Sequence, residues 1–458
     1  MQQKALTVSR RWRLATVLMA STVLVSDLAA CTSYKPLPLS ETAQLAPDVS
    51  QLRGVSPLQG GAAQQPLSVA AVGLLALQNN PDLKAVRLQH GLAQAQLLQA
   101  GLPPNPVVTG AILPLLAGPA YTWAWNAGIS MDITSLITLS ARRRGAAAAA
   151  RQVDAQILWQ EWQTVGQARL LAVDVMEGER TLVLLRRQRD LLAHRAEQSR
   201  RAVESGNATI TVLAPDVAAL QSARVQLDDA EQQQFARRHK LNALLGLRPE
   251  APLPLMQQPD VPTIDRAAVL KALPALPERR PDLIALRLGY QAQDAKVRAA
   301  ILAQFPPLTF GVIGGSDNTN IRNIGPQPTV ELPIFNRNQG NVAIEQATRQ
   351  QLHAEYAARL DQADGEVRAM LVEIAQIRRQ LAAAQAERAA TAQIARQASA
   401  AFAAGNLDER GYVDLINTHL GKEQQIVALE QAMLDKQVAI DTLTGAGMPL
   451  VALQEARS

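Results

Sequence analysis

Residues 145–207 read GAAAAARQVDAQILWQEWQTVGQARLLAVDVMEGERTLVLLRRQRDLLAHRAEQSRRAVESGN, and this stretch decides the fold. It contains no proline, and Gly166 and Gly178 are the only glycines between Gly145 and its last three residues. Alanine, glutamine, arginine, leucine and glutamate dominate, and these residues lose little conformational freedom in a helix. Apolar residues recur at helical spacing. The stretch therefore predicts a very long helix that reverses at Gly206, with a second helix returning to Gly246.

The predicted helix is too long for a globular core. About 70 residues at ~1.5 Å rise per residue make a rod of roughly 105 Å. Helices longer than about 25 residues indicate a coiled coil, a membrane span or a helical repeat. No uncharged run of about 18 residues occurs in this stretch, so a membrane-spanning helix is excluded. Aromatic residues make up only 3% of the chain, which favours helices packed against helices.

The chain is an internal duplication. Asn80-Pro81-Asp82-Leu83 recurs 200 residues later as Arg280-Pro281-Asp282-Leu283, and Ser205-Gly206-Asn207 recurs 199 residues later as Ala404-Gly405-Asn406. A constant spacing between several landmarks predicts two structurally similar halves. We expect a first repeat at 67–246, a proline-rich linker at 247–275, a second repeat at 276–446 and a tail at 447–458.

Each repeat carries a predicted pair of strands, at about 106–133 and about 307–335. Residues 121–133 alternate, with Trp123, Trp125 and Ile129 on one face and polar residues on the other. In the second repeat we expect strands at 307–314 and 329–335 around a polar loop at 316–326. Ordinary soluble hairpins are the alternative, but strands of ~9–11 residues with tryptophans near one end fit a bilayer. Four strands cannot close a barrel, so membrane insertion requires oligomerisation, and three copies would supply twelve strands.

The N-terminal segment predicts export and lipidation. Residues 1–30 have the basic start, apolar stretch and small residues of a signal peptide. Leu28-Ala29-Ala30-Cys31 resembles the bacterial lipobox, in which the cysteine becomes the lipidated first residue. Cys31 is the only cysteine, and Thr32 after it favours the outer membrane. Residues 31–66 then read as a lipidated tether. Much of the formal charge of +5 lies in the leader, so a nucleic-acid-binding surface is not supported.

The order of elements behind the lipobox resembles the TolC-type outer-membrane efflux ducts. The resemblance covers about 67–445, and its most specific parts are Asn80–Leu83, Leu332–Asn341 and Tyr412-Val413-Asp414-Leu415. It implies a mainly helical fold in which long antiparallel hairpins form an α-barrel, and four strands per chain join a trimeric 12-stranded β-barrel. It also implies a periplasmic adaptor and an inner-membrane pump of the RND type as partners. The sequence of Leu332–Asn341 is similar to that of outer-membrane partners of heavy-metal pumps of the cobalt-zinc-cadmium type.

The resemblance also implies the site residues. The exposed reversals at Gly206, Asn207, Gly405 and Asn406 are the expected docking points for the adaptor. Asp216 and Asp414 follow the reversals on the returning helices, where family members carry gate acids. Three-fold symmetry would make each a ring of carboxylates, which favours cations. The alternative is that each is a solvated charge on a helix surface.

The sequence contains no constellation of catalytic residues, so we expect no enzyme activity and no cofactor beyond the lipid on Cys31. The five histidines are scattered without metal-ligand spacing, and no metal site is expected. The predicted function is a passive exit duct for drugs, metal ions or other small molecules. A duct for type I protein secretion fits equally well, and a periplasmic adaptor or coiled-coil scaffold is a weaker alternative because the chain has two hairpins and two strand pairs.

Overall fold

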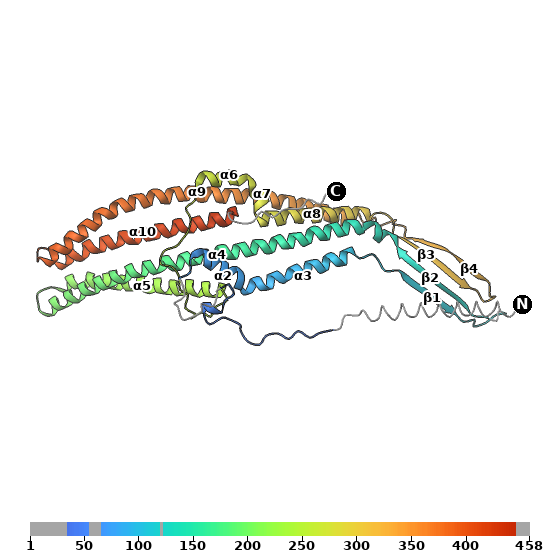
Figure 1. The fold of residues 1–458 in the computed structure, drawn as a ribbon, viewed down its shortest axis with the longest axis horizontal. Helices are drawn as coiled ribbons and strands as arrows, with labels where there is room; N and C mark the ends of the chain where they lie inside the picture. The colour runs from blue at the N-terminus through green and yellow to red at the C-terminus, as the bar shows by residue number, and fades with distance from the viewer. Residues whose placement is uncertain (1–33, 55–65, 120–121, 446–458) are drawn as a thin grey trace. The chain divides into compact units, whose positions relative to one another are not determined.

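The computed structural model describes residues 34–54, 66–119 and 122–445. The chain divides into two units, Met1–Gln44 and Leu45–Ser458. In the first unit, residues 34–44 are exposed and form no helix or strand. The predicted signal peptide, Cys31 and the tail at 447–458 lie outside the described residues. All the elements below belong to the second unit (Figure 1).

The first repeat contains one helix of 72 residues and its returning partner. Asn80 caps the helix that starts at Pro81 by accepting a hydrogen bond from the Leu83 N–H (2.9 Å). Asp132 caps the long helix in the same way through Ser135 (3.1 Å). The elements are η1 (Val49–Gln51), α2 (Val69–Asn79), α3 (Pro81–Gly101), β1 (Val107–Leu113), β2 (Ala124–Asp132), α4 (Ile133–Glu204) and α5 (Ile210–Leu244).

The second repeat has the same order of helix, strands and long helical hairpin. Its elements are α6 (Arg266–Ala272), η2 (Leu273–Ala275), α7 (Leu276–Arg279), α8 (Pro281–Leu302), β3 (Leu308–Ser316), β4 (Arg322–Val330), α9 (Gln339–Ala403) and α10 (Glu409–Thr444). The predicted fold class, mainly helical with a small β part, is confirmed for the chain. No helix among the described residues is both long enough and apolar enough to cross a bilayer.

The four strands form one antiparallel sheet in the order β1-β2-β3-β4. The two repeats meet inside this sheet, because β2 pairs with β3. Figure 1 shows the strands leaving the ends of α3, α4 and α8, so the sheet and the helical reversals lie at opposite ends of α4. At ~1.5 Å per residue, α4 separates them by roughly 108 Å.

The prediction for the last strand was wrong. We expected 329–335, but β4 spans Arg322–Val330 and only five residues separate it from β3. The error came from interpreting the polar residues of 316–326 as a loop, although Pro326 and Pro328 belong to the strand. Both lie opposite β3 residues. Glu331 N–H donates toward β3, to Pro307 O (3.2 Å). Because backbone N–H groups alternate in direction along a strand, the N–H groups of the even-numbered residues of β4 point to the open edge of the sheet. A proline is tolerated there because no partner strand within the chain needs its N–H.

Strand boundaries in the first repeat also differ from the prediction. β1 ends at Leu113, and Ile133, the last residue of the predicted alternating strand, starts α4 instead of ending β2. The cap formed by Asp132 explains the second difference, since it satisfies a free N–H of the first helical turn.

Much of the core lies along α4, which packs against α2, α3, α5, α8 and α10, and two further clusters lie along α9 and α10. Gly166 and Gly178 are buried contact points on this helix. A Cβ on Gly166 would lie 2.6 Å from Thr442 Oγ1, and one on Gly178 would lie 2.1 Å from Gln234 Oε1. At Gly166, Thr442 of α10 leaves no room for a side chain, whereas at Gly178 the space is filled by the flexible end of Gln234 of α5.

Candidate functional site

The first candidate site is the sheet, whose two faces differ in chemistry. Residues directly opposite each other in neighbouring strands lie on the same face. One face combines apolar residues from all four strands, namely Val108, Ile112, Trp125, Ala127, Ile129, Met131, Leu308, Phe310, Val312, Ile324, Pro326, Pro328 and Val330. Several are exposed, with Val108 76%, Ile112 69% and Ile324 81% exposed. We call this surface the apolar face.

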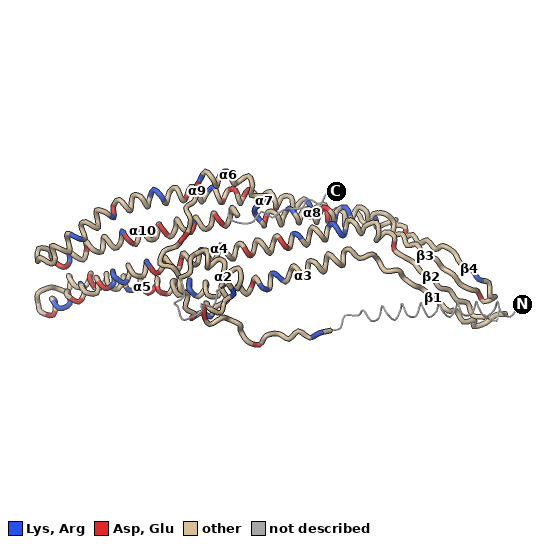
Figure 2. Tube along the Cα trace, in the orientation of Figure 1, with Lys and Arg blue, Asp and Glu red and all other residues tan. Residues whose placement is uncertain are grey.

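The other face is mainly polar or small. It carries Thr109, Asn126, Ser130, Asp132, Thr309, Asn323, Gln327 and Thr329, with several glycines between them. Asp132 and Arg322 are the only charged residues in the four described strands. Figure 2 shows the contrast with the helices, which carry both signs of charge along their length. A sheet with one apolar and one polar surface can separate a hydrocarbon phase from water.

The second candidate site is the pair of helical reversals. Gly206 and Gly405 have φ values of 76° and 74°, the left-handed conformation that favours glycine at a helix end. In each reversal the following asparagine N–H bonds back to the helix, Asn207 to Ala202 O (2.7 Å) and Asn406 to Ala401 O (2.8 Å). A Cβ on either glycine would meet no described atom within 4 Å. The predicted docking residues therefore lie in exposed turns with open space beside them.

Asp216 does not lie on a free surface. Its side chain is 0% exposed and sits between two arginines. Arg195 Nε donates to its Oδ1 (2.7 Å), and Ser199 Oγ (2.6 Å) and Arg410 Nη2 (2.8 Å) donate to its Oδ2. Burial opposes ionisation, but the hydrogen bonds and charges of Arg195, Ser199 and Arg410 outweigh it and lower the pKa of Asp216. Asp216 is therefore a buried, ionised carboxylate whose charge is balanced by two arginines in this conformation.

Asp414 differs, because its side chain is 63% exposed. Arg195 Nη1 donates to Asp414 Oδ1 (2.5 Å), so one arginine of α4 binds both predicted gate acids. Arg410, which lies on α10 of the second hairpin, donates to Asp216 on α5 of the first hairpin. We call Arg195, Ser199, Asp216, Arg410 and Asp414 the tip cluster. It connects the two hairpins just behind their reversals.

Sequence reasoning missed Arg195 and Ser199. A hairpin folded at Gly206 brings together positions at similar distances on either side of the turn. Arg195 lies 11 residues before Gly206 and Asp216 lies 10 after it. This near-symmetric spacing was a usable signal for the ion pair. The contacts of Arg195 with α10 had no such signal, because they join segments more than 200 residues apart.

Two further acids, Glu177, which is buried, and Asp435, which is half-buried, lie midway along the helices. Glu177 on α4 is 0% exposed, and burial raises its pKa despite the hydrogen bond from Arg180. Burial, followed by the negative charge of Asp174, raises the pKa of Asp435 on α10 to about 7. Within residues 34–54, 66–119 and 122–445, no group of three or more His, Cys, Asp or Glu side chains could hold a metal ion. Glu177 and Asp435 are thus acids whose pKa is raised by packing between the helices.

The chain is similar to known outer-membrane channels. Residues 272–446 match the family model described as outer membrane efflux protein. A comparison with curated proteins found no significant match.

Solved structures extend the likeness to both repeats. A structure of CusC is 19% identical, with a TM-score of 0.66, and the match covers 91% of this chain and 100% of that one. The Campylobacter jejuni CmeC outer membrane channel is 17% identical, with a TM-score of 0.65 over 91% of this chain and 95% of that one. The open Neisseria gonorrhoeae MtrE outer membrane channel is 18% identical, with a TM-score of 0.65 over 91% and 98%. At these identities the structures establish a shared fold. The family match over the second repeat confirms the predicted resemblance to outer-membrane efflux proteins, and the solved structures show that both repeats share the fold of these channels.

Proposed function

We propose that this protein is the outer-membrane exit duct of a tripartite efflux system, through which solutes pass from the periplasm to the exterior. The two-faced sheet is the observation that carries the proposal. Its strands of up to nine residues span roughly 30 Å at ~3.3 Å per residue, close to the thickness of a hydrocarbon core. The apolar face would contact lipid and the polar face would line a water-filled lumen.

The sheet has two open edges, at β1 and β4. Unpaired backbone groups are costly in hydrocarbon, so the edges must pair with other chains. Three copies joined β4 to β1 give twelve strands, a number large enough to close. The same symmetry would place three pairs of helical hairpins around a periplasmic tunnel.

The two reversals are the proposed contact with the periplasmic adaptor, which in turn joins an inner-membrane pump of the RND type. Gly206, Asn207, Gly405 and Asn406 are exposed, and a Cβ on either glycine would meet no described atom within 4 Å. The proposed gate is the tip cluster as a whole. In the described conformation Asp216 is held by arginines, so opening would require breaking these ion pairs. Asp414, which is more exposed, is then the acid that could line the pore.

Fractionation of cells that express the full chain tests the duct. We expect heat-modifiable trimers in the outer membrane and palmitate labelling that is lost in Cys31→Ala. A soluble monomer would contradict membrane insertion. Trimers in the outer membrane without labelling would contradict only the lipid anchor.

The docking proposal has its own test. Gly206→Asp combined with Gly405→Asp places charged side chains at both reversals, and aspartate tolerates the left-handed backbone better than most residues. Efflux should fall by at least about tenfold while trimers and membrane insertion persist. Unchanged export from normally inserted trimers would contradict the proposal that the adaptor docks at the reversals.

A further inference from the structure

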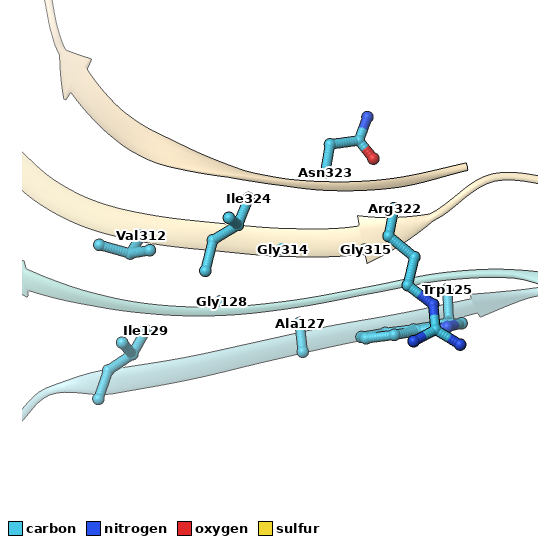
Figure 3. Close-up of a pocket in the computed structure, with 10 residues that line it drawn as sticks. All are labelled: Trp125, Ala127, Gly128, Ile129, Val312, Gly314, Gly315, Arg322, Asn323 and Ile324. Carbon is cyan, nitrogen blue, oxygen red and sulfur yellow. The ribbon is translucent and has the colours of Figure 1, made fainter. Parts of the chain in front are cut away.

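A hollow of about 570 Å³ lies on the apolar face, at the end of the sheet farthest from the helices (Figure 3). The strand register explains it. Along the first cross-strand row, Trp125, Ser316 and Arg322 are neighbours, and along the second row Ala127, Gly314 and Ile324 are neighbours. Gly314 and Ala127 are small, so the sheet surface between the larger side chains is left uncovered.

The rim of the hollow has two chemically different ends. Ile129, Val312 and Ile324 surround the inner end and are respectively 52%, 41% and 81% exposed. Trp125 and Arg322 line the outer end, on either side of Ser316 in the first cross-strand row (Figure 3). Arg322 brings the only positive charge on the four strands to this end.

The two polar groups of the outer end have no partner in the part of the chain that the structure describes. The Arg322 guanidinium forms no ion pair or side-chain hydrogen bond there, whereas most arginines of the helices bind a carboxylate, as Arg195 and Arg280 do. The Trp125 indole N–H likewise donates to no described acceptor, in contrast to the indole of Trp162, which donates to Thr442 O (2.8 Å). Both groups are hydrogen-bond donors, so together they offer a site for an anion.

We infer that this hollow binds one acyl lipid with a phosphate-bearing headgroup, the acyl chain lying over Gly314 and the phosphate on Arg322 and Trp125. Arginine matches phosphate through paired N–H donors, and tryptophan favours the boundary between hydrocarbon and water. A zwitterionic headgroup would bring a positive charge close to Arg322 and would bind less tightly. The inference rests on the proposed membrane insertion, which puts the outer end of the sheet at the exterior surface of the bilayer.

Native mass spectrometry of the full chain, purified from membranes in detergent, tests the site. The probes are phosphatidylglycerol and phosphatidylcholine with identical acyl chains. We expect wild type to retain phosphatidylglycerol about tenfold more tightly. Arg322→Gln should remove this preference, and Trp125→Phe should reduce it.

Two further variants separate the site from a general effect of charge. Arg337→Gln removes an exposed arginine beyond the opposite end of β4 and should leave the preference unchanged. Gly314→Val fills the hollow, and a Cβ at Gly314 meets only ordinary contacts of 3.4 Å or more, so the strand should tolerate it. It should weaken the retention of both lipids about equally. Inorganic phosphate at millimolar concentration should not displace the lipid.

The inference is overturned if wild type shows no headgroup preference, if Arg337→Gln removes the preference as fully as Arg322→Gln does, or if inorganic phosphate displaces the lipid. It is also overturned if binding survives both Gly314→Val and Arg322→Gln. Outer-membrane trimers without a lipid preference would leave the duct standing and remove only this site. Absence of the protein from the outer membrane would remove the proposed function itself.

Discussion

The two helical reversals have nearly the same backbone but opposite surroundings. Gly206 and Gly405 have almost equal φ values, and each reversal closes with the same asparagine N–H bond. Behind the first reversal, Arg195 and Ser199 hold a buried Asp216. At the spacing of 199 residues, the second repeat has Ile394 and Ala398 in their places. Asp216 itself corresponds to Leu415, so the buried acid and its cradle are both absent from the second hairpin, and Asp414, one residue earlier, is exposed.

This difference shows that the duplication kept the turn while the charges diverged. The first hairpin supplies the buried acid, and the second supplies Arg410 as an additional cation. The tip cluster thus exists only when the two repeats lie together. The helix starts differ in the same manner, since Asp408 caps α10 through Gly411 N–H (3.0 Å) while Thr209 makes no side-chain cap.

The largest effect is expected from Asp216→Asn. It leaves Arg195 and Arg410 around an uncharged, buried side chain, and breaking a buried pair in this way costs roughly 3 kcal/mol. Hydrogen–deuterium exchange should become faster at the end of α4 and the starts of α5 and α10. Equal exchange in Asp216→Asn and wild type would show that the tip cluster does not hold the hairpins.

The asymmetry between repeats also extends to Asp435, whose repeat-related position on α5 is Ala236. Its folded pKa of about 7 lies above the ordinary value of 3.8, so the folded state binds the proton more tightly. The contribution of Asp435 to the free energy of unfolding is therefore fully present below pH about 4. It is lost as pH rises toward 7, by at most about 1.4 kcal/mol per pH unit.

Asp435→Asn should remove much of this pH dependence and raise stability at pH 8 by on the order of 1 to 2 kcal/mol. The charged groups around Asp435 are Asp174 and Glu177 of α4, Arg237 of α5 and Lys436 of α10. Thermal unfolding of the trimer between pH 4 and pH 8 measures the effect. A wild-type profile that rises through this window parallel to that of the variant would contradict it.

Gly206→Ala and Gly405→Ala test the similarity of the two turns. Each alanine must adopt a positive φ without any steric contact, so each should cost about 1 kcal/mol. The two losses should agree within about 0.5 kcal/mol. A much larger loss at one turn, measured by thermal unfolding, would mean that the reversals differ in backbone as well as in charge.

The smallest effect is expected from Asp414→Asn. An exposed ion pair contributes less than about 1 kcal/mol, so stability should hardly change. Cation selectivity in bilayer conductance should fall if Asp414 lines the pore, because a ring of three carboxylates attracts cations. Unchanged selectivity in an open trimer would remove Asp414 from the pore wall. Asp216→Asn, compared in the same assay, shows whether the buried acid acts on the pore only through the fold.

Much of the fold could be predicted because the signals are local. The long helices follow from residue type and spacing along α4, the reversals follow from Gly206 and Gly405, and the two faces of β2 follow from strict alternation. β4 was misplaced because the polar residues of 316–326 indicate a loop. Pro326 and Pro328 fit a strand only at an edge, and edge position depends on the whole sheet.

The candidate sites divide along the same line. By itself, the sequence determined the exposed glycine turns, the alternating strand and the repeat, since each depends on backbone preferences within a few residues. Only the tertiary structure decided that Asp216 is buried, that Arg195 binds acids from two hairpins, and that Gly314 opens a hollow beside Arg322. These features depend on which distant segments come into contact. The charge or volume of one residue does not predict a site unless the residues that contact it across the fold are known.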